Sequence, residues 1–468
     1  MMEIPCGMQE QFLEAKQLIE SSNDIKIYTH TDCDGICSGA ILSIILDRLN
    51  KDYEIEFVNL DEIENLDLDH KLTIFSDLGS GQGVDKNAKD GQKILILDHH
   101  PPLRDINYKN DKAYTYLEIN PMFYGIDGSY YVCGGGLCYF LAKTFGFKDL
   151  SWIGVLSAIG DMQNNKTGHF EGLNEIIQED AINEGLLKVT KNDLNIYGRS
   201  TRPLYVALSY FSDVKLPITN NQQEAKVVLE ELGVDEKHNR KTLSEVTEED
   251  KMEIKKFLSR MISKRVPPKY LKYVPKLIVG DAYTFLNEEE GSFLRDGSEF
   301  STAMNACGRN RKEAIGVDII KGDRLVALDA LEEVSKTHKY NLATSISKVA
   351  DNYHSEIIEL DNFQYFDCSD FDEDIASNII GTITGMVLGY CNWKKPILGF
   401  SKPKNNQIKV SLRCSKLLAY DGIHFGNMMR EIAKEVGGTG GGHAIACGAY
   451  IPNEKKSEFL DKFNRKLQ

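Results

Sequence analysis

Four short runs in the first third of the chain contain the residue types that bind metal ions. Each run follows an apolar stretch with the length of a buried strand or helix. The runs are His30-Thr31-Asp32-Cys33-Asp34-Gly35, Ser76-Asp77, Asp98-His99-His100 and Gly160-Asp161. Carboxylate oxygens and imidazole nitrogens are common ligands of divalent cations in proteins. If the apolar stretches end at one edge of a sheet, these runs predict a metal site.

The charge of the runs favours a pair of divalent cations. Four clustered aspartates carry four negative charges, which two dications neutralise; without metal they would repel one another and could not all stay ionised. Mixed carboxylate and imidazole ligation suits Mn²⁺ best, with Mg²⁺, Zn²⁺ and iron as competitors. Two ions about 3.5–4 Å apart can activate water and stabilise the oxygens of an in-line displacement at phosphorus. Cleavage of a phosphoester or phosphoanhydride is therefore the leading reaction class.

Each run also has an ordinary structural explanation. A single Asp-His-His sequence occurs in solvated loops, and a single Asp-x-Asp-Gly sequence is a common turn. Four such runs at the ends of predicted elements are harder to explain by coincidence, so we favour a shared site.

The apolar segments before the first three runs are predicted to be strands. They are short, rich in β-branched or apolar residues, and bounded by polar residues or glycine, and they comprise Ile25–Thr29, Leu72–Phe75 and Ile94–Leu97. Residues 36–49, between the first two segments, have apolar residues at helical spacing. Strands that alternate with helices predict an α/β fold with a parallel sheet. Ligands of such sheets bind beyond the carboxyl ends of the strands, where the acidic runs lie.

A second candidate site lies near the carboxyl end of the sequence. The run Gly437-Gly438-Thr439-Gly440-Gly441-Gly442-His443 follows the segment Lys409–Arg413. Glycines allow close approach of the backbone to a ligand and can direct amide groups at phosphate. His443 and Arg413 can contact an anion directly. The alternative is a glycine-rich turn between a helix and a strand.

The four runs together resemble the DHH phosphoesterase superfamily, which is named for the motif present here as Asp98-His99-His100. Its other motifs have counterparts in the same order, and the glycine run resembles the C-terminal domain that holds substrate in DHH proteins. Further motifs are similar to those of archaeal RecJ-like nucleases, the group that includes GINS-associated nuclease. These motifs are Asn120-Pro121, Gly125–Ser129, Thr201–Leu204, Glu299–Thr302 and Asn305–Arg309. The resemblance extends from about Ile25 to about Pro452.

The resemblance implies a role for each residue of the site. The metal ligands would be His30, Asp32, Asp34, Asp77, His99 and Asp161. Asp32 and Asp77 would hold one ion. The other ion would be held by Asp34, Asp77, His99 and Asp161, so Asp77 would bridge the two ions. Several branches place a ligand histidine where this chain has Tyr28, so His30 is kept as an additional candidate.

The same resemblance implies which residues act on the substrate. The catalytic residues would be Asp34, Asp98, His99 and His100. His100 would face the substrate phosphate, and Asp98 would orient its neighbours. The substrate-binding residues would be His100, Arg413, Gly441, Gly442 and His443.

A chain of 468 residues exceeds what a single core usually serves, so we expect several domains. We predict a parallel-sheet DHH catalytic domain over residues 1–195 and a helical insertion and connector over 196–354. A smaller C-terminal α/β domain over 355–468 would bind substrate across a cleft. Within the middle segment we predict helices over 222–232 and 245–261, with a helix start at Thr247–Asp250, and strands around 277–279 and 314–320.

The net charge of −15 argues against passive coating of nucleic acid. However, residues 254–276 contain eight basic and no acidic side chains, interleaved with Tyr270 and Tyr273. This basic stretch could follow a phosphate backbone while the tyrosines stack on bases. A solvated helix face or a partner-binding surface is an equally good explanation.

The ten cysteines are scattered and form no Cys-x-x-Cys motif, so we expect reduced thiols in the core. Cys33 lies within the first run and is expected to point into the protein beneath the site. No 18-residue apolar run and no signal-peptide pattern occur, and these absences predict a cytoplasmic protein without membrane contact.

These observations together predict a metal-dependent exonuclease that hydrolyses single-stranded DNA, or RNA, with two divalent cations, Mn²⁺ or else Mg²⁺, in DNA replication or repair. One alternative is a phosphodiesterase for short oligonucleotides or cyclic dinucleotides. Another is a replication factor that acts beside GINS or a helicase, because relatives in this group do so.

Overall fold

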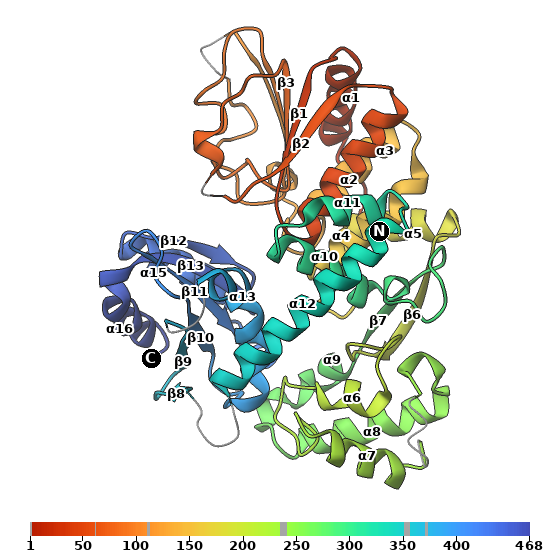
Figure 1. Ribbon diagram of the computed structural model, residues 1–468, viewed down its shortest axis with the longest axis vertical. Coiled ribbons are helices and arrows are strands. Elements are labelled where there is room, and N and C mark those ends of the chain that lie inside the picture. The colour runs from red at the N-terminus through yellow and green to blue at the C-terminus, as the bar shows by residue number, and fades with distance from the viewer. Residues whose placement is uncertain (1, 61, 110–112, 235–240, 351–355, 370–372) are drawn as a thin grey trace. The chain divides into compact units, whose positions relative to one another are not determined.

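The computed structural model describes residues 2–60, 62–109, 113–234, 241–350, 356–369 and 373–468. The chain forms two compact units (Figure 1). The first unit comprises Met1–Asn192 and Asp281–Ser335, and the second comprises Asp193–Gly280 and Lys336–Gln468. The segment 281–335 therefore packs with the amino-terminal part of the chain, although about 90 residues of the second unit precede it. The domain boundary predicted at residue 355 lies outside the described residues.

A five-stranded parallel sheet forms the centre of the first unit, and it confirms the predicted α/β class. Its strands are β1 (Ile25–Thr29), β2 (Tyr53–Phe57), β3 (Leu72–Ser76), β4 (Lys93–Leu97) and β5 (Thr115–Ile119). All three strands predicted from apolar segments are present, as β1, β3 and β4. The spatial order is β2-β1-β3-β4-β5.

This order positions a ligand site between β1 and β3. The chain leaves β1 toward β2 on one side and later returns to β3 on the other side, so the direction of winding reverses there. The pairing register aligns the final residues of four adjacent strands, β1, β3, β4 and β5, at Thr29, Ser76, Leu97 and Ile119. The residues that follow these strands therefore leave the sheet at the same level.

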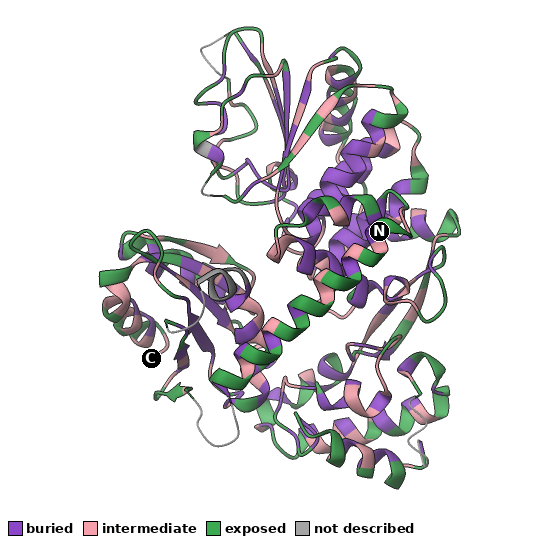
Figure 2. Ribbon diagram, viewed as in Figure 1, coloured by how far each residue is buried: buried purple, intermediate pink, exposed green. Residues whose placement is uncertain are grey.

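Helices cover one face of this sheet. Those packed on the strands are α1 (Cys6–Glu20), α2 (Cys33–Arg48) and α3 (Gly134–Thr144). A second layer packs on these helices and contains α4 (Ser151–Gly160), α5 (Leu173–Asn183), α10 (Gly297–Arg309) and α11 (Glu313–Ile320). Side chains from these helices and from the sheet form one large apolar cluster. Figure 2 shows α2 as almost wholly buried, because helices pack on it from several sides. The helix predicted over residues 36–49 is confirmed as α2.

Irregular segments cover the other face of the sheet. Phe75 and Ile96 point from the central strands into a smaller cluster with Val58, Leu78 and Val84 from the connecting loops. The apolar residues of β3 and β4 are therefore buried on both sides, which explains why both strands read as continuous apolar runs.

Two of the predicted strands are wrong in whole or in part. Residues 314–320 belong to helix α11, and residues 277 and 278 end helix α9 (Val274–Ile278), so strand β7 (Val279–Phe285) begins only at residue 279. The β-branched residues of α11 suggested a strand. Val317, Ile319 and Ile320 are instead buried in the first unit's core, where α11 packs on α2 and α10, so tertiary packing outweighs the strand preference.

The second unit contains the helical segment that was predicted in the middle of the sequence. The helices of this segment are α6 (Leu204–Ser209), α7 (Gln222–Glu231), α8 (Glu248–Ser263) and α9. Two further elements run from one unit into the other: strand β6 (Leu187–Leu194), which pairs with β7, and helix α12 (Val326–Val349). The predicted helix start is confirmed, since the Thr247 side chain accepts a hydrogen bond from the Asp250 amide at 3.1 Å.

A six-stranded mixed sheet forms the rest of the second unit. Its strands are β8 (Ile358–Glu359), β9 (Gln364–Asp367), β10 (Ile397–Phe400), β11 (Gln407–Arg413), β12 (Thr439–Gly442) and β13 (Ala446–Pro452), in the order β12-β13-β11-β10-β9-β8. The accompanying helices are α13 (Glu373–Met386), α14 (Lys416–Tyr420), α15 (Phe425–Glu435) and α16 (Lys456–Lys466). Helices α15 and α16 pack on one face of this sheet.

The structure limits what the basic stretch 254–276 can do. Tyr270 is only 6% exposed and packs edge-on against Trp393, so its ring belongs to the core and cannot stack on a base. Tyr273 packs against Tyr420, and Lys269 pairs with Asp421. The stretch therefore contributes to packing in the second unit.

Among the described residues, no helix combines the length and hydrophobicity needed to cross a bilayer.

Candidate metal centre

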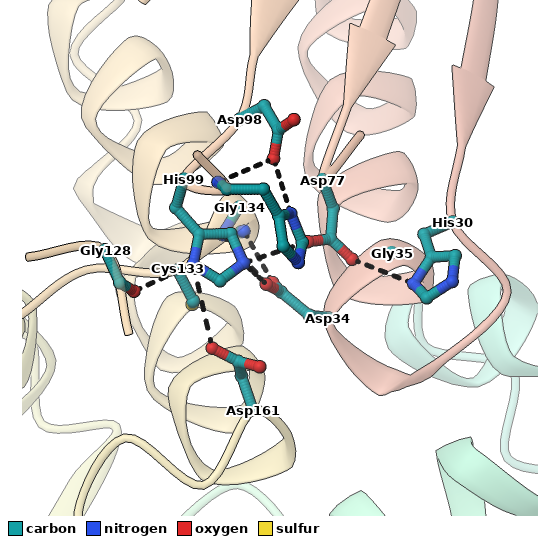
Figure 3. A network of polar contacts seen from close by, with 12 residues as sticks. His30, Asp34, Gly35, Asp77, Asp98, His99, Gly128, Cys133, Gly134 and Asp161 are labelled. Carbon is teal, nitrogen blue, oxygen red and sulfur yellow. Dashed lines mark hydrogen bonds and ion pairs between the residues drawn. The ribbon is translucent and has the colours of Figure 1, made fainter. Parts of the chain in front are cut away.

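The aligned strand ends bring the four runs together in the first unit (Figure 3). His30 follows β1, Asp77 follows β3, and Asp98 follows β4. Asp34 lies in the first turn of α2, and Asp161 directly follows α4. Most of these side chains are buried, whereas His100 has a side chain that is 45% exposed.

Asp77 lies between two groups of ligand-type atoms. One group comprises His30, Asp32 and Asp77, and another comprises Asp34, His99 and Asp161; within each group the ligand atoms lie within 4.8 Å of one another. Asp77 Oδ2 is 3.5 Å from His30 Nδ1, while Asp77 Oδ1 is 3.3 Å from His99 Nε2. The two oxygens of this carboxylate thus face the two groups, as expected of a carboxylate that bridges two cations.

The backbone around Asp77 is held in an unusual conformation. Its φ is 59°, in the left-handed region that aspartate tolerates better than most residues. Gly134, at the start of α3, approaches closely: a Cβ at Gly134 would lie 2.6 Å from the Asp77 Cβ. Only glycine leaves room for the carboxylate to point into the site, so the α3 terminus and the Asp77 turn fix each other.

Asp34 is fixed by the amino-terminal end of α3. Its carboxylate accepts hydrogen bonds from the amides of Gly134 at 2.8 Å and Gly135 at 2.7 Å, and from the Ser157 hydroxyl of α4. The free amide groups of a helix terminus and the helix dipole both favour a negative charge at this position. Asp34 Oδ2 remains 3.6 Å from His99 Nε2, on the side of the metal groups.

A backbone carbonyl determines how His99 faces the site. His99 Nδ1–H donates a hydrogen bond to the Gly128 carbonyl at 2.8 Å, so Nε2 is left to face Asp77 and Asp34. Such an anchored second nitrogen is typical of metal-binding histidines. Gln163 donates to both the Gly128 carbonyl and Asp161 Oδ2 at 2.7 Å and thereby ties Asp161 to the same loop.

Asp98 holds His100, and its ligand atoms also lie within 4.8 Å of those of Asp77, His99 and His100. Asp98 Oδ1 lies 2.8 Å from His100 Nδ1 and accepts the His100 amide, and Oδ2 accepts the Ser80 amide at 2.9 Å. Asn120, after β5, donates to the His100 carbonyl at 2.8 Å. These contacts fix the imidazole so that its Nε2 is available to a ligand.

The residues fit divalent cations. Within the described part of the chain, His30 Nδ1, Asp77 Oδ2 and His99 Nε2 are buried and have no hydrogen-bond partner, although all three belong to the converging groups. Burial and the charges of Asp77 and Asp161 raise the pKa of Asp34 well above its ordinary value. Burial alone would lower the pKa of His99, but Asp161, Asp77 and Asp34 raise it well above its usual range. Cations between these groups would supply the missing partners and remove the repulsion.

Several residues support the site in ways that the sequence analysis did not assign to them. The side chain of Asn305, on α10, accepts the Cys33 amide at 3.1 Å and so holds the loop that carries Asp32 and Asp34. The run Gly134-Gly135-Gly136 is a sequence signal for close backbone approach, and its first two amides hold Asp34. Cys33 is buried as expected, and its thiol lies 3.9 Å from the Leu156 carbonyl. All ten cysteines are free, and only Cys6 is exposed.

The predicted substrate-binding residues other than His100 lie in the second unit. Arg413 ends β11, Gly441 and Gly442 end β12, and His443 begins the turn to β13. Burial lowers the pKa of Arg413, whose guanidinium lies against Gly381 of α13. Gly442 packs against the first residues of α15, and the exposed Arg430 of that helix lies beside Gly441. Sequence analysis did not single out Arg430.

Mn²⁺ is expected to raise the thermal stability of the protein. Ions that bind the folded cluster and not the unfolded chain stabilise by about 2.7 kcal/mol when free Mn²⁺ exceeds its Kd a hundredfold. Differential scanning calorimetry with Mn²⁺ and then with excess chelator measures this effect. An equal Tm in both conditions would contradict a metal centre here.

Family models match three segments of the chain. Residues 24–155 match the DHH family N-terminal domain, residues 196–274 the DHH-CID domain, and residues 361–468 the DHHA1 domain. The uncharacterized protein MJ0831 of Methanocaldococcus jannaschii is 31% identical over 446 residues, which cover 94% of this chain and 92% of that protein. A second protein of this organism, MJ1071, is 30% identical over 39% of this chain and 54% of its own length.

Solved structures share the fold at low sequence identity. CDC45 from Entamoeba histolytica superimposes with a TM-score of 0.63 at 15% identity, over 98% of both chains. RecJ from Thermus thermophilus, in complex with Mn²⁺, gives a TM-score of 0.55 at 13% identity, over all of this chain and 55% of RecJ. With the DHH, DHH-CID and DHHA1 segments in this order, and a relative that matches over nearly its full length, the chain belongs to the DHH family and has a RecJ-like fold.

Proposed function

We propose that this protein is a metal-dependent exonuclease that hydrolyses phosphodiester bonds at the end of single-stranded DNA or RNA, in DNA replication or repair. The observation that carries the proposal is the buried carboxylate of Asp77, whose two oxygens face two separate groups of ligand atoms. The family and the RecJ-like fold agree with a phosphoesterase.

Each residue of the site would have a defined part in the reaction. His30, Asp32 and Asp77 would hold one cation, and Asp34, Asp77, His99 and Asp161 the other. Bound Mn²⁺ or Mg²⁺ would acidify water and neutralise charge on phosphate oxygens. The exposed Nε2 of His100 would donate a hydrogen bond to the substrate phosphate, with Asp98 holding the ring through Nδ1.

Removing the anchor of His100 is expected to slow the reaction without removing metal. In Asp98→Asn the uncharged amide holds the His100 ring less firmly than the carboxylate does, so we expect kcat to fall about 10- to 100-fold. Calorimetric titration with Mn²⁺ should give the same stoichiometry as the wild-type protein. Unchanged kcat would show that Asp98 does not position His100 for catalysis.

A strand labelled separately at each end tests the activity. With Mn²⁺ we expect stepwise release of mononucleotides from single strands, and slower release from blunt duplexes. The label released first would give the polarity. Equal rates on both substrates would contradict single-strand specificity, and no release from any DNA or RNA strand would contradict the nuclease proposal. Comparing a dinucleotide, a cyclic dinucleotide and a long strand separates the short-substrate alternative.

A role beside GINS or a helicase is a second candidate. The fold likeness to CDC45 extends over 98% of both chains, and residues 196–274 match the DHH-CID model. Such a role is compatible with catalysis, because the described site keeps its converging carboxylates and histidines. Affinity purification of the protein from its own cells, followed by mass spectrometry, would identify GINS or helicase subunits. Their absence from the purified complex would contradict this role.

A further inference from the structure

A buried ion pair joins the two loops that carry Asp77 and His100. The loop after β3 contains Asp85 and the loop after β4 contains Arg104, and neither loop includes a helix or strand. The Arg104 guanidinium pairs with Asp85 Oδ1, and the two side chains are only 12% and 6% exposed. Arg104 Nη1 also donates a hydrogen bond to the Gln82 carbonyl at 3.2 Å, so one side chain of the second loop holds two groups of the first.

Three tyrosines surround this ion pair. The hydroxyls of Tyr108 and Tyr114 donate to Asp85 Oδ2 at 2.7 and 2.5 Å. The centre of the Arg104 guanidinium lies 4.7 Å from the centre of the Tyr108 ring and 5.2 Å from that of the Tyr116 ring. Burial alone would raise the pKa of Asp85, but the two hydroxyl groups and the charge of Arg104 lower it below its ordinary value. The carboxylate therefore stays ionised and keeps hold of the guanidinium.

A short series of hydrogen bonds leads from Arg104 to the imidazole of His100. The amide of Leu103, directly before Arg104, donates to the Ser80 carbonyl at 2.7 Å. The Ser80 amide in turn donates to Asp98 Oδ2 at 2.9 Å, and Asp98 Oδ1 lies 2.8 Å from His100 Nδ1. The position of the Ser80 amide thus depends on how the two loops are held, and the orientation of Asp98 depends on that amide.

Stability alone would be the simplest explanation of the ion pair. However, burying two charges costs desolvation free energy, and apolar side chains of similar volume often stabilise a protein as well or better. Leu78, Val84 and Tyr114 already provide apolar burial on this face of the sheet. A guanidinium supplies direction instead, because its planar set of donors fixes where each acceptor lies. The contacts therefore favour a role in positioning the loops.

We propose that Arg104 is a positioning residue for phosphodiester hydrolysis: paired with Asp85, it holds the Ser80 amide against Asp98 and thereby directs His100 at the substrate phosphate. The proposal rests on the proposed function for the reaction, and it deepens that function. It assigns a part in the reaction to a side chain that lies outside the groups of ligand atoms given by the described residues.

Kinetics of Arg104→Met with Mn²⁺ and an end-labelled single strand test this role. We expect kcat to fall about 10- to 100-fold, with the Mn²⁺ stoichiometry of the wild-type protein. The double variant with Asp98→Asn is the decisive measurement. If Arg104 acts through Asp98, the double variant should be at most about threefold slower than Asp98→Asn alone, whereas independent effects would multiply. Asp85→Asn removes the charge but keeps the shape, and it should give the same pattern if Arg104→Met does not fold.

Arg48→Met is the matched control in the same unit. Arg48 also pairs with an aspartate, Asp149, and its guanidinium also lies 4.7 Å from the centre of an aromatic ring, that of Phe147. Arg48 is the last residue of α2, whereas Asp34 lies in the first turn of that helix. Arg48→Met should therefore leave kcat unchanged, even where it lowers Tm.

Hydrogen exchange in EDTA gives a second measurement that does not depend on activity. In Arg104→Met the amides of Ser80 and Leu103 should exchange faster than in the wild-type protein, and in Arg48→Met they should not. Wild-type kcat in Arg104→Met, loss of Mn²⁺ from this variant, or effects that multiply with those of Asp98→Asn would refute positioning through Asp98. If the wild-type protein hydrolyses no strand, the nuclease proposal fails; hydrogen exchange then decides the role of Arg104, and unchanged exchange at Ser80 would refute it.

Discussion

Asp77→Asn is expected to lose one or both cations and almost all activity. The carboxylate faces His30 with one oxygen and His99 with the other, so one substitution removes a ligand from each group. Metal ions supply several kcal/mol of stabilisation to such a reaction, which corresponds to a loss of about 10³-fold or more in kcat. Calorimetric titration should show Mn²⁺ stoichiometry falling from two to one or none.

The same variant should also change stability in an informative way. Without metal, Asp77→Asn removes one charge from a repulsive buried cluster, so its Tm in chelator should equal or exceed that of the wild-type protein. Its Tm should then no longer rise with Mn²⁺. Asp69→Asn, which changes an exposed carboxylate paired with Lys89, is the matched control and should behave as wild type. Full activity of Asp77→Asn would remove this cluster from the mechanism.

Gly308→Ala is expected to inactivate the enzyme from outside the ligand set. A Cβ at Gly308 would lie 1.6 Å from the Thr31 carbonyl oxygen, which belongs to the loop between β1 and α2. Backbone cannot yield as a flexible side chain does, so α10 must move away and the Asn305 contact with Cys33 must be lost. Overpacking of this kind costs about 1–3 kcal/mol in stability. Displacing Asp32 and Asp34 by about 1 Å should lower kcat about 100-fold or more.

A neighbouring glycine provides the matched control. Gly316, on α11, also packs against α2, but a Cβ there would meet the side chain of Ile36, with its Cγ2 atom at 2.9 Å, and not the backbone of the ligand loop. Gly316→Ala should therefore lower Tm through overpacking in the same helical layer but keep kcat near the wild-type value. If both variants lose activity equally, general damage to the helical layer explains the result; if Gly308→Ala is fully active, α10 does not position the first ligand loop.

Much of the first unit could be predicted from the order of residues along the chain. Strands β1, β3 and β4 are short and buried on both faces, so their apolar runs are distinct, and each ends directly before a polar group. Parallel strands must place those ends at one edge, which is why convergence of His30, Asp77 and Asp98 was expected. The helix over 314–320 was missed because its β-branched residues favour strands until α2 and α10 bury them.

The sequence by itself determined which residue types could hold cations and at which sheet edge they would gather, since alternation of strands and helices dictates that edge. Only the tertiary structure decided how each group is oriented. Three sets of contacts join segments that are far apart in the sequence. Asp77 faces both His30 and His99, the Gly134 and Gly135 amides donate to Asp34, and Asn305 accepts the Cys33 amide. The physical reason is that hydrogen-bond direction and close packing depend on distances between chain segments, which no local pattern encodes.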